Sequence, residues 1–195
     1  IKQLFIMTEG RLRKLFRGIG TAITTFALGI AFTDYIGSVK FVSGKSMQPT
    51  LNGLVNEEDD HQDLVLVNKY RIKMSKKIER GDIVMFKNPY NRNEDAVKRV
   101  IGLPGDIIYS RIQPKTSEGE RSKRPMYGRK ATMIGRGKCW VEGDNSEMSE
   151  DSNDYGPVPL ALVKGRVSYV LYPFCRFGPV SHEYPDQPDR KKRIT

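Results

Sequence analysis

The chain has 195 residues, of which 38% are hydrophobic and 29% are charged. This composition is typical of one folded domain with a short additional segment, and it excludes a chain that is disordered throughout. The net charge of +10 is compatible with binding to nucleic acid or to an anionic membrane surface, and equally with a solvated basic face. Because the sequence has no helix-turn-helix pattern, metal-finger spacing or RNA-binding aromatic signature, we expect no nucleic-acid partner.

An apolar run at residues 18–36 follows a basic cluster at residues 11–17. The run contains one charged residue, Asp34, and its length is close to the roughly 20 residues that cross a bilayer. The basic cluster lies on the amino-terminal side of the run, as the positive-inside rule expects. We therefore predict a basic flank and a single transmembrane helix over residues 1–36. A cleaved signal or transit segment and a buried amphipathic helix are the alternatives.

A β-branched run at residues 39–42 predicts a strand that ends in a turn over residues 43–50. Gly44 allows a positive φ or the close approach of a substrate backbone, and Pro49 restricts the exit of the turn. The turn would present the hydroxyl group of Ser46 at the end of a strand. By itself such a serine is weak evidence for catalysis, because most turn hydroxyls bond to the local backbone.

Residues 51–62 form a polar loop in which an acidic run precedes His61. Carboxylates in a row are more often solvated than coordinating, and one histidine does not make a zinc site, so no metal or cofactor is predicted. The second histidine, His182, lies near the polar tail, which argues against a Ser-His-Asp triad. Cys139 and Cys175 could pair in an oxidising compartment, but we expect free thiols.

Short apolar segments separated by Gly, Pro and Asn turns continue along the chain and predict a mainly β domain of barrel or sandwich type over residues 37–195. The expected strands lie at residues 63–68, 83–86, 96–101, 107–111 and 167–172, with a further strand and turn at residues 139–145. Two stretches rich in Lys and Arg interrupt this pattern. Residues 69–77 are expected to be a surface link, and residues 112–138 an insertion that contacts phospholipid or is simply solvated.

Lys98 lies inside one of these strands, between Val97 and the apolar pair Val100 and Ile101. Burial at this position would disfavour the charged ammonium form, and a neutral amine can act as a general base. A serine needs such a base to attack a carbonyl carbon, and Ser-Lys pairs are a known variant of the catalytic triad. The alternative is a lysine whose stem packs while its ammonium group reaches water.

Four motifs occur in a defined order along the chain. They are Ser-Gly-Lys-Ser-Met-Gln-Pro-Thr at residues 43–50, Gly-Asp-Ile-Val at residues 81–84, Lys-Arg-Val-Ile-Gly-Leu-Pro-Gly-Asp at residues 98–106, and Gly-Asp-Asn at residues 143–145 with Ser-Glu-Asp-Ser-Asn at residues 149–153. In this order they resemble the type I signal peptidase family, and the likeness covers most of the chain. The resemblance implies a signal-peptidase-like β domain behind the predicted transmembrane helix.

The resemblance also implies roles for individual residues. Ser46 would be the nucleophile and Lys98 the general base. Ser149 would hydrogen-bond and orient the lysine amine. Asp151 would be structural and would pair with a basic residue such as Arg99.

Three further positions bear on the substrate cleft and on the branch of the family. Met47 would line the cleft, and the backbone N–H of Ser46 would supply one oxyanion donor. Some bacterial members have a serine where this chain has Gly44, so another donor would have to complete the oxyanion hole. Many members have the sequence Asp-Ser-Arg where residues 151–153 of this chain are Asp-Ser-Asn. The Asp-Ser-Asn sequence resembles the second-subunit branch of the mitochondrial inner membrane proteases.

The function implied is a membrane-anchored serine endopeptidase that removes sorting or signal segments. Its partners would be precursor proteins, a sister protease subunit and membrane lipid. Its location would be the mitochondrial inner membrane with the catalytic domain in the intermembrane space, or a bacterial plasma membrane with the domain outside. The alternatives are a bacterial-type signal peptidase I, a self-cleaving Ser-Lys repressor-type protease, and a noncatalytic tethered β domain that binds a partner subunit.

Overall fold

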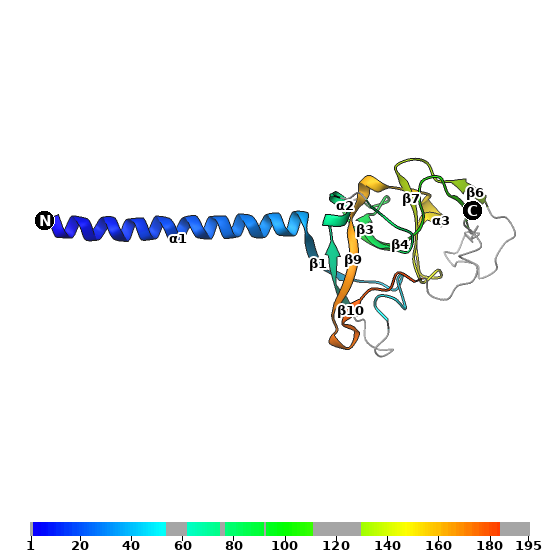
Figure 1. Cartoon of the computed structure of the whole chain (residues 1–195). Coiled ribbons are helices and arrows are strands. Elements are labelled where there is room, and N and C mark those ends of the chain that lie inside the picture. The colour runs from blue at the N-terminus through cyan, green and yellow to red at the C-terminus, as the bar shows by residue number, and fades with distance from the viewer. Residues whose placement is uncertain (1, 54–61, 75–76, 92, 111–129, 184–195) are drawn as a thin grey trace.

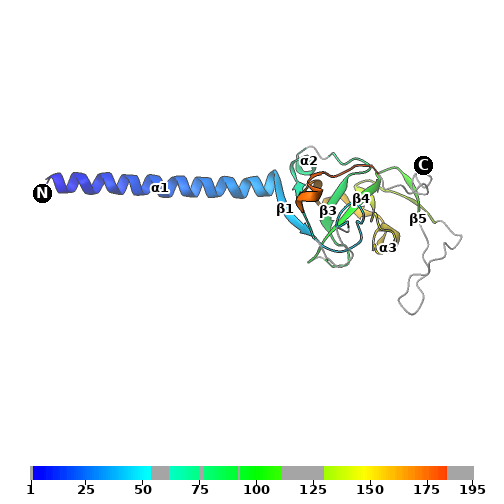
Figure 2. The ribbon, with the colours of Figure 1, turned by 90° about the horizontal axis from the view of Figure 1, so that it is seen from below.

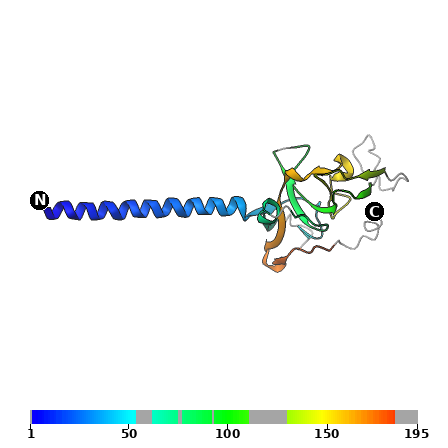
Figure 3. The ribbon, with the colours of Figure 1, turned by 45° about the horizontal axis from the view of Figure 1, so that its top comes forward.

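A long amino-terminal helix precedes a β-rich domain in the computed structural model, which describes residues 2–53, 62–74, 77–91, 93–110 and 130–183. The helix, α1 (Lys2–Tyr35), extends away from the domain in all three views (Figures 1, 2 and 3). Its large apolar side chains are exposed from Leu15 to Ile30. The chain enters the domain directly after α1 through the first strand, β1 (Gly37–Val42).

The main sheet has eight strands, and every pairing in it is antiparallel. Its order is β1-β2-β9-β3-β4-β7-β8, with β10 paired to β9. The strands after β1 are β2 (Asp63–Asn68), β3 (Ile83–Lys87), β4 (Asp95–Gly102), β7 (Lys138–Glu142), β8 (Val158–Pro159), β9 (Val163–Tyr172) and β10 (Gly178–Pro179). The strand β1 is therefore an edge of the sheet, and β4 lies near its other end.

A second, two-stranded sheet and four short helices complete the described structure. The sheet consists of β5 (Ile107–Ser110) and β6 (Lys130–Met133), and it lies at the end of the domain far from α1 (Figures 1 and 2). The helices are α2 (Tyr70–Lys73), α3 (Ser152–Tyr155), and the 3-10 turns η1 (Leu160–Leu162) and η2 (Phe174–Arg176).

Valine-rich strands build the core because their alternate side chains point to one face of the sheet. Along β2, buried and half-buried residues alternate strictly, and Val65 and Val67 face inward. Met47 and Leu51 belong to the same buried cluster as these valines. Val42, before Ser46, is in this cluster too, so the turn after β1 is anchored in the core on both sides of Ser46.

The mainly β fold expected from the sequence is confirmed, and β2, β3, β4 and β9 include the strands predicted at those positions. Two local differences appear. The basic link at residues 69–77 contains the one-turn helix α2, and β6 forms within the segment predicted as an insertion. Residues 111–129 of that segment and the basic end of the chain lie outside the described residues.

The expectation of a transmembrane helix is not supported. In the described part of the chain, no helix combines the length and the apolar character needed to cross a bilayer. The run at residues 18–36 is diluted by four threonines and three glycines. Threonine hydroxyls in it donate to carbonyl oxygens of the preceding turn, as in the contact of Thr25 Oγ1 with the oxygen of Thr21 at 2.8 Å.

We predict that Phe86→Ala lowers the free energy of unfolding by about 3–5 kcal/mol, because it deletes a ring that is 0% exposed and leaves a cavity between β3 and its neighbours. Urea denaturation followed by the fluorescence of the buried Trp140 measures this change. The control is Phe174→Ala, whose ring is 80% exposed and whose loss should change stability by less than about 0.5 kcal/mol. Equal effects of the two substitutions would contradict this packing.

Candidate active site

The turn that carries Ser46 is shaped by Gly44 and Asn52, which adopt φ angles of 89° and 53°. The Asn52 side chain donates from Nδ2 to the carbonyl oxygens of Val42 and Gly44, at 3.0 and 2.9 Å. Its backbone N–H donates to Asp63 Oδ2, and the Asp63 N–H donates back to Asn52 Oδ1, both at 2.8 Å. The turn is therefore closed on itself and tied to the start of β2.

Arg176, in the turn η2 far along the chain, supports the same segment from outside. Its Nη1 lies 3.0 and 2.8 Å from the two carboxylate oxygens of Asp63, and its Nη2 donates to the carbonyl oxygen of Thr50 at 2.8 Å. Sequence reasoning missed both Asn52 and Arg176. An asparagine in a turn is a weak local signal for the left-handed conformation, whereas nothing near Arg176 in the sequence indicates its partners.

Ser46 and Lys98 line one cleft of about 400 Å³. Lys98 is 6% exposed in the middle of β4, and Ser46 is half-buried. Met47 also lines this cleft. The other lining residues come from the end of β1 and its turn, from β3 and from the start of β4: Lys40, Phe41, Val42, Ser43, Gly44, Met85, Glu94, Asp95, Ala96 and Val97.

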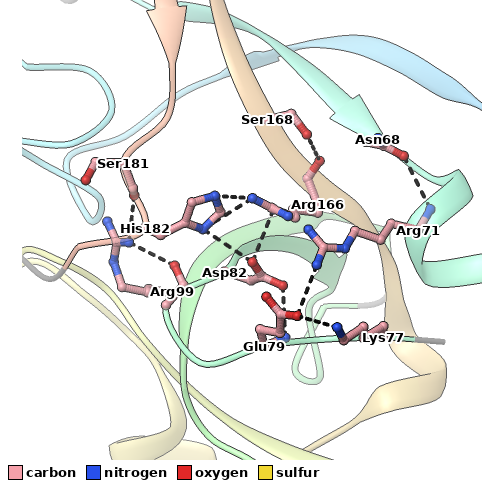
Figure 4. Close-up of polar contacts among 11 residues, drawn as sticks. Asn68, Arg71, Lys77, Glu79, Asp82, Arg99, Arg166, Ser168, Ser181 and His182 are labelled. Atoms are coloured by element: carbon pink, nitrogen blue, oxygen red, sulfur yellow. Dashed lines mark hydrogen bonds and ion pairs between the residues drawn. The ribbon is translucent and has the colours of Figure 1, made fainter. Parts of the chain in front are cut away.

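A buried ion pair joins the strand of Lys98 to the turn that follows β7. Arg99 donates from Nε and Nη2 to the two carboxylate oxygens of Asp144, at 2.9 and 2.7 Å, and both side chains are fully buried. Thr50 Oγ1 donates to the same carboxylate at 2.5 Å. Arg99 Nη1 donates to the carbonyl oxygens of Gly81 and Ser181, each at 2.9 Å (Figure 4). The expected pairing of Asp151 with Arg99 is thus wrong, because Asp144 neutralises this guanidinium.

Gly143 brings the two serine segments against each other. A Cβ atom on Gly143 would lie 2.5 Å from Ser149 Cβ and 2.5 Å from the carbonyl oxygen of Ser46. That carbonyl oxygen accepts the backbone N–H of Asn145 at 3.0 Å. Only glycine therefore fits between the turn of Ser46 and Ser149, so the close approach of these two segments requires this residue.

Asp151 is buried among hydrogen-bond donors rather than cations. Its Oδ2 accepts from Ser149 Oγ at 2.9 Å and from the Gly143 N–H at 3.1 Å, and its Oδ1 accepts from the Asn153 N–H at 3.0 Å. The last contact caps α3. Burial raises the pKa of Asp151 and the nearby carboxylate of Glu142 raises it further, while the donors from Asn153 and Gly143 oppose the shift.

The second histidine belongs to a separate polar cluster (Figure 4). Asp82 is 1% exposed and pairs with Arg166 Nε at 3.1 Å and with His182 Nδ1 at 3.4 Å. Burial and the Arg166 charge lower the pKa of His182, so its ring is mostly neutral at physiological pH. The cluster attaches the segment after β10 to β9.

Neither cysteine is among the described residues that line the cleft. The described residues also contain no group of three or more side chains that could hold a metal ion. Cys139 and Cys175 are free thiols, the first buried and the second exposed. Burial raises the pKa of Cys139 to about 12, which keeps it protonated. His61 lies outside the described residues.

Comparison with known proteins agrees with the motifs. The family model "Signal peptidase, peptidase S26" matches residues 14–172. Mitochondrial inner membrane protease subunit 1 of Mus musculus is 36% identical over 172 residues, which cover 88% of this chain and 92% of that protein. Mitochondrial inner membrane protease subunit 2 of Danio rerio is 34% identical over 162 residues, which cover 83% and 78%. A crystal structure of a signal peptidase I from Enterococcus faecalis is 25% identical, covering 46% of this chain and 96% of that chain with a TM-score of 0.36.

We predict that Asp144→Ala lowers the free energy of unfolding by about 3–5 kcal/mol, because it leaves the buried guanidinium of Arg99 without its counter-charge. Urea denaturation gives the change. The matched control is Glu79→Ala, which breaks ion pairs of a carboxylate that is 48% exposed and should change stability far less, because water screens these pairs. If the two variants lost similar amounts of unfolding free energy, the buried ion pair would contribute no more to stability than the exposed ones.

Proposed function

Because the chain belongs to the signal peptidase, peptidase S26, family, we propose that it is a serine endopeptidase with a Ser46–Lys98 dyad that removes sorting or signal segments from precursor proteins. The observation that carries the proposal is the shared cleft: a turn serine and a strand lysine, distant in sequence, both line it. A half-buried serine and a buried lysine that line the same cleft are what a Ser-Lys mechanism needs.

In the first step, the neutral amine of Lys98 takes the proton of Ser46 Oγ while this oxygen attacks the scissile carbonyl carbon. Burial of Lys98 favours the neutral amine, because a charged ammonium loses its hydration in the strand. The backbone N–H of Ser46 stabilises the developing oxyanion. The protonated amine then gives its proton to the leaving amine, and a water molecule activated by Lys98 hydrolyses the acyl-enzyme.

Ser149 and Asp151 are proposed to orient the base. Ser149 is 2% exposed and packs beside Gly143, which also contacts the backbone of Ser46. Its hydroxyl is fixed by the hydrogen bond to Asp151. Arg99 contributes by its pairing with Asp144, which holds β4 and therefore Lys98 against the nucleophile turn.

The substrate is proposed to bind as an extended strand beside β1. This strand is an edge of the main sheet, and its end lines the cleft together with the start of β4. Pairing of a peptide with a sheet edge supplies main-chain hydrogen bonds independent of its side chains. Met47, Met85 and Val97 are buried and line the cleft, so a small residue before the scissile bond suits the space.

The site of action is proposed to be the mitochondrial inner membrane, with the catalytic domain in the intermembrane space. The relatives' names support the membrane and suggest that the chain works with a sister subunit. Identities of 36% and 34% do not separate subunit 1 from subunit 2. The Asp-Ser-Asn sequence at residues 151–153 favours the second-subunit branch of these proteases.

We predict that Ser46→Ala and Lys98→Met each abolish cleavage of a precursor that the wild-type chain cleaves, because they remove the nucleophile and the base. Lys98→Arg should be equally inactive, since a guanidinium stays protonated. Mitochondrial intermembrane-space precursors and bacterial preproteins, incubated with detergent-solubilised chain with and without a sister subunit, provide the assay. Whichever of the two groups of precursors the chain cleaves better also distinguishes the mitochondrial from the bacterial location.

The control for these variants is Lys77→Met, a substitution of a side chain that is 66% exposed, and this variant should cleave like the wild type.

Wild-type activity should rise with pH between neutral and alkaline conditions, because the active form has an uncharged amine. A flat profile would contradict Lys98 as the base. Cleavage that survives Ser46→Ala and Lys98→Met would exclude the dyad.

A further inference from the structure

The side-chain amide of Asn153 lies between two buried carboxylates. Its Nδ2 donates to Asp151 Oδ1 at 2.8 Å and to Glu142 Oε1 at 3.1 Å. Glu142 is 2% exposed and Asp151 is 4% exposed. An amide NH₂ group has two N–H donors, and here two acidic side chains accept from it.

Glu142 is itself fixed from the other side. Its Oε1 also accepts from Trp140 Nε1 at 2.9 Å, and in the β4–β7 pairing it lies opposite Arg99. Glu142 therefore stays close to Asp151, although like charges in a buried site repel. Asn153 is the group seen to bridge them.

The hydrogen bond from Ser149 to Asp151 has a direction that depends on the charge of Asp151. An ionised carboxylate only accepts hydrogen bonds, so Ser149 must use its single proton on Asp151. In the proposed site, where Ser149 orients the base, the remaining lone pairs of Ser149 then accept an N–H of the Lys98 amine. This arrangement leaves the nitrogen lone pair of Lys98 available for the Ser46 proton.

A protonated Asp151 would reverse this direction. Its O–H could donate to Ser149, and the Ser149 proton would be released to point at the Lys98 nitrogen. The lone pair that must receive the Ser46 proton would then be occupied. Burial and Glu142 both favour this unproductive form, whereas the donors from Asn153 and Gly143 oppose it.

We propose that Asn153 is a positioning residue for the reaction: by donating to Asp151 and Glu142 together, it keeps Asp151 a hydrogen-bond acceptor for Ser149 and so keeps the Lys98 lone pair directed at Ser46. The inference rests on the proposed Ser46–Lys98 function and deepens it. A neutral amide takes the place in which many members of the family carry an arginine, so hydrogen bonding rather than charge holds the two carboxylates together.

Several other titratable groups surround Asp151. Asp154 and Tyr155 belong to α3, Asp154 accepting the Asp151 N–H at 3.0 Å, and Cys139 of β7 lies beside Tyr155. Burial raises the pKa values of Tyr155 and Cys139, so both stay neutral in the working range. Other ionisable groups on these elements and on the strand paired with β7 are Glu150, which precedes Asp151 in the chain, Glu142 of β7, and Arg99 and Lys98 of β4, the last of which is uncharged in the proposed active form.

The test compares Asn153→Asp with Asn153→Arg in the full-length chain, using a precursor that the wild type cleaves. Asn153→Asp has the same size but loses the donors and adds a third carboxylate. We expect kcat near neutral pH to fall about 10- to 30-fold, with KM within about twofold, because the variant changes a hydrogen bond to a charged group and not the cleft. Asn153→Arg should keep kcat within about threefold, since a guanidinium also donates to both carboxylates.

The pH profile separates positioning from a merely structural effect. The active form needs Asp151 ionised and Lys98 neutral, and raising the pH favours both. In Asn153→Asp the pKa of Asp151 should rise further, so the loss of kcat should shrink toward alkaline pH and the ascending limb should become steeper than in the wild type. A loss by the same factor at every pH would overturn the proposal.

The matched control is Asn93→Asp, an exposed asparagine in the loop between β3 and β4, which should match the wild type. If Asn153→Asp does not fold, Asn153→Ala removes the same donors without adding charge and decides the question in its place. If Ser46→Ala and Lys98→Met are inactive while the Asn153 variant equals Asn93→Asp, this inference alone fails. If Ser46→Ala and Lys98→Met cleave like the wild type, the proposed function fails and the inference with it.

Discussion

The ion pair between Arg99 and Asp144 is the constraint on which the arrangement of the site depends. A guanidinium does not lose its proton in a protein, so burying one at 0% exposure requires a counter-charge and acceptors for its remaining N–H groups. Asp144, Thr50 and the carbonyl oxygens of Gly81 and Ser181 supply them. Four other chain segments must therefore meet β4 at one point for this charge to be satisfied.

The meeting point determines where Lys98 and the turn of Ser46 lie. Lys98 immediately precedes Arg99 in β4, and Gly143 immediately precedes Asp144 in the turn after β7. Thr50, at the end of the turn that carries Ser46, donates to the Asp144 carboxylate. Satisfying one buried charge thus positions the proposed base Lys98 and the turn of Ser46, while the missing side chain of Gly143 allows Ser149 to approach.

The two carboxylates near this point have different tasks because their partners differ. Asp144 is neutralised by a bidentate cation, which makes it a structural group. Asp151 is held by N–H and O–H donors from Gly143, Ser149 and Asn153, and its protonation state decides which way the Ser149 hydroxyl points. Charge pairing therefore holds the frame of the site, and the direction of a hydrogen bond is what we propose orients Lys98.

Local residue chemistry was sufficient to predict the strands that became β2, β3, β4 and β9 and the turn at residues 43–50, because β-branched alternation and turn residues act over a few positions. The positive φ of Gly44 is of the same kind. For Lys98 the local pattern left two interpretations open, a buried amine and an ammonium group that reaches water, and only the tertiary structure showed the side chain buried. The partner of Arg99, the support from Asn52 and Arg176, and the bridge made by Asn153 were decided by tertiary structure alone. These contacts depend on which buried donors and acceptors meet across the sheet, and the spacing of residues along the sequence does not predict such meetings.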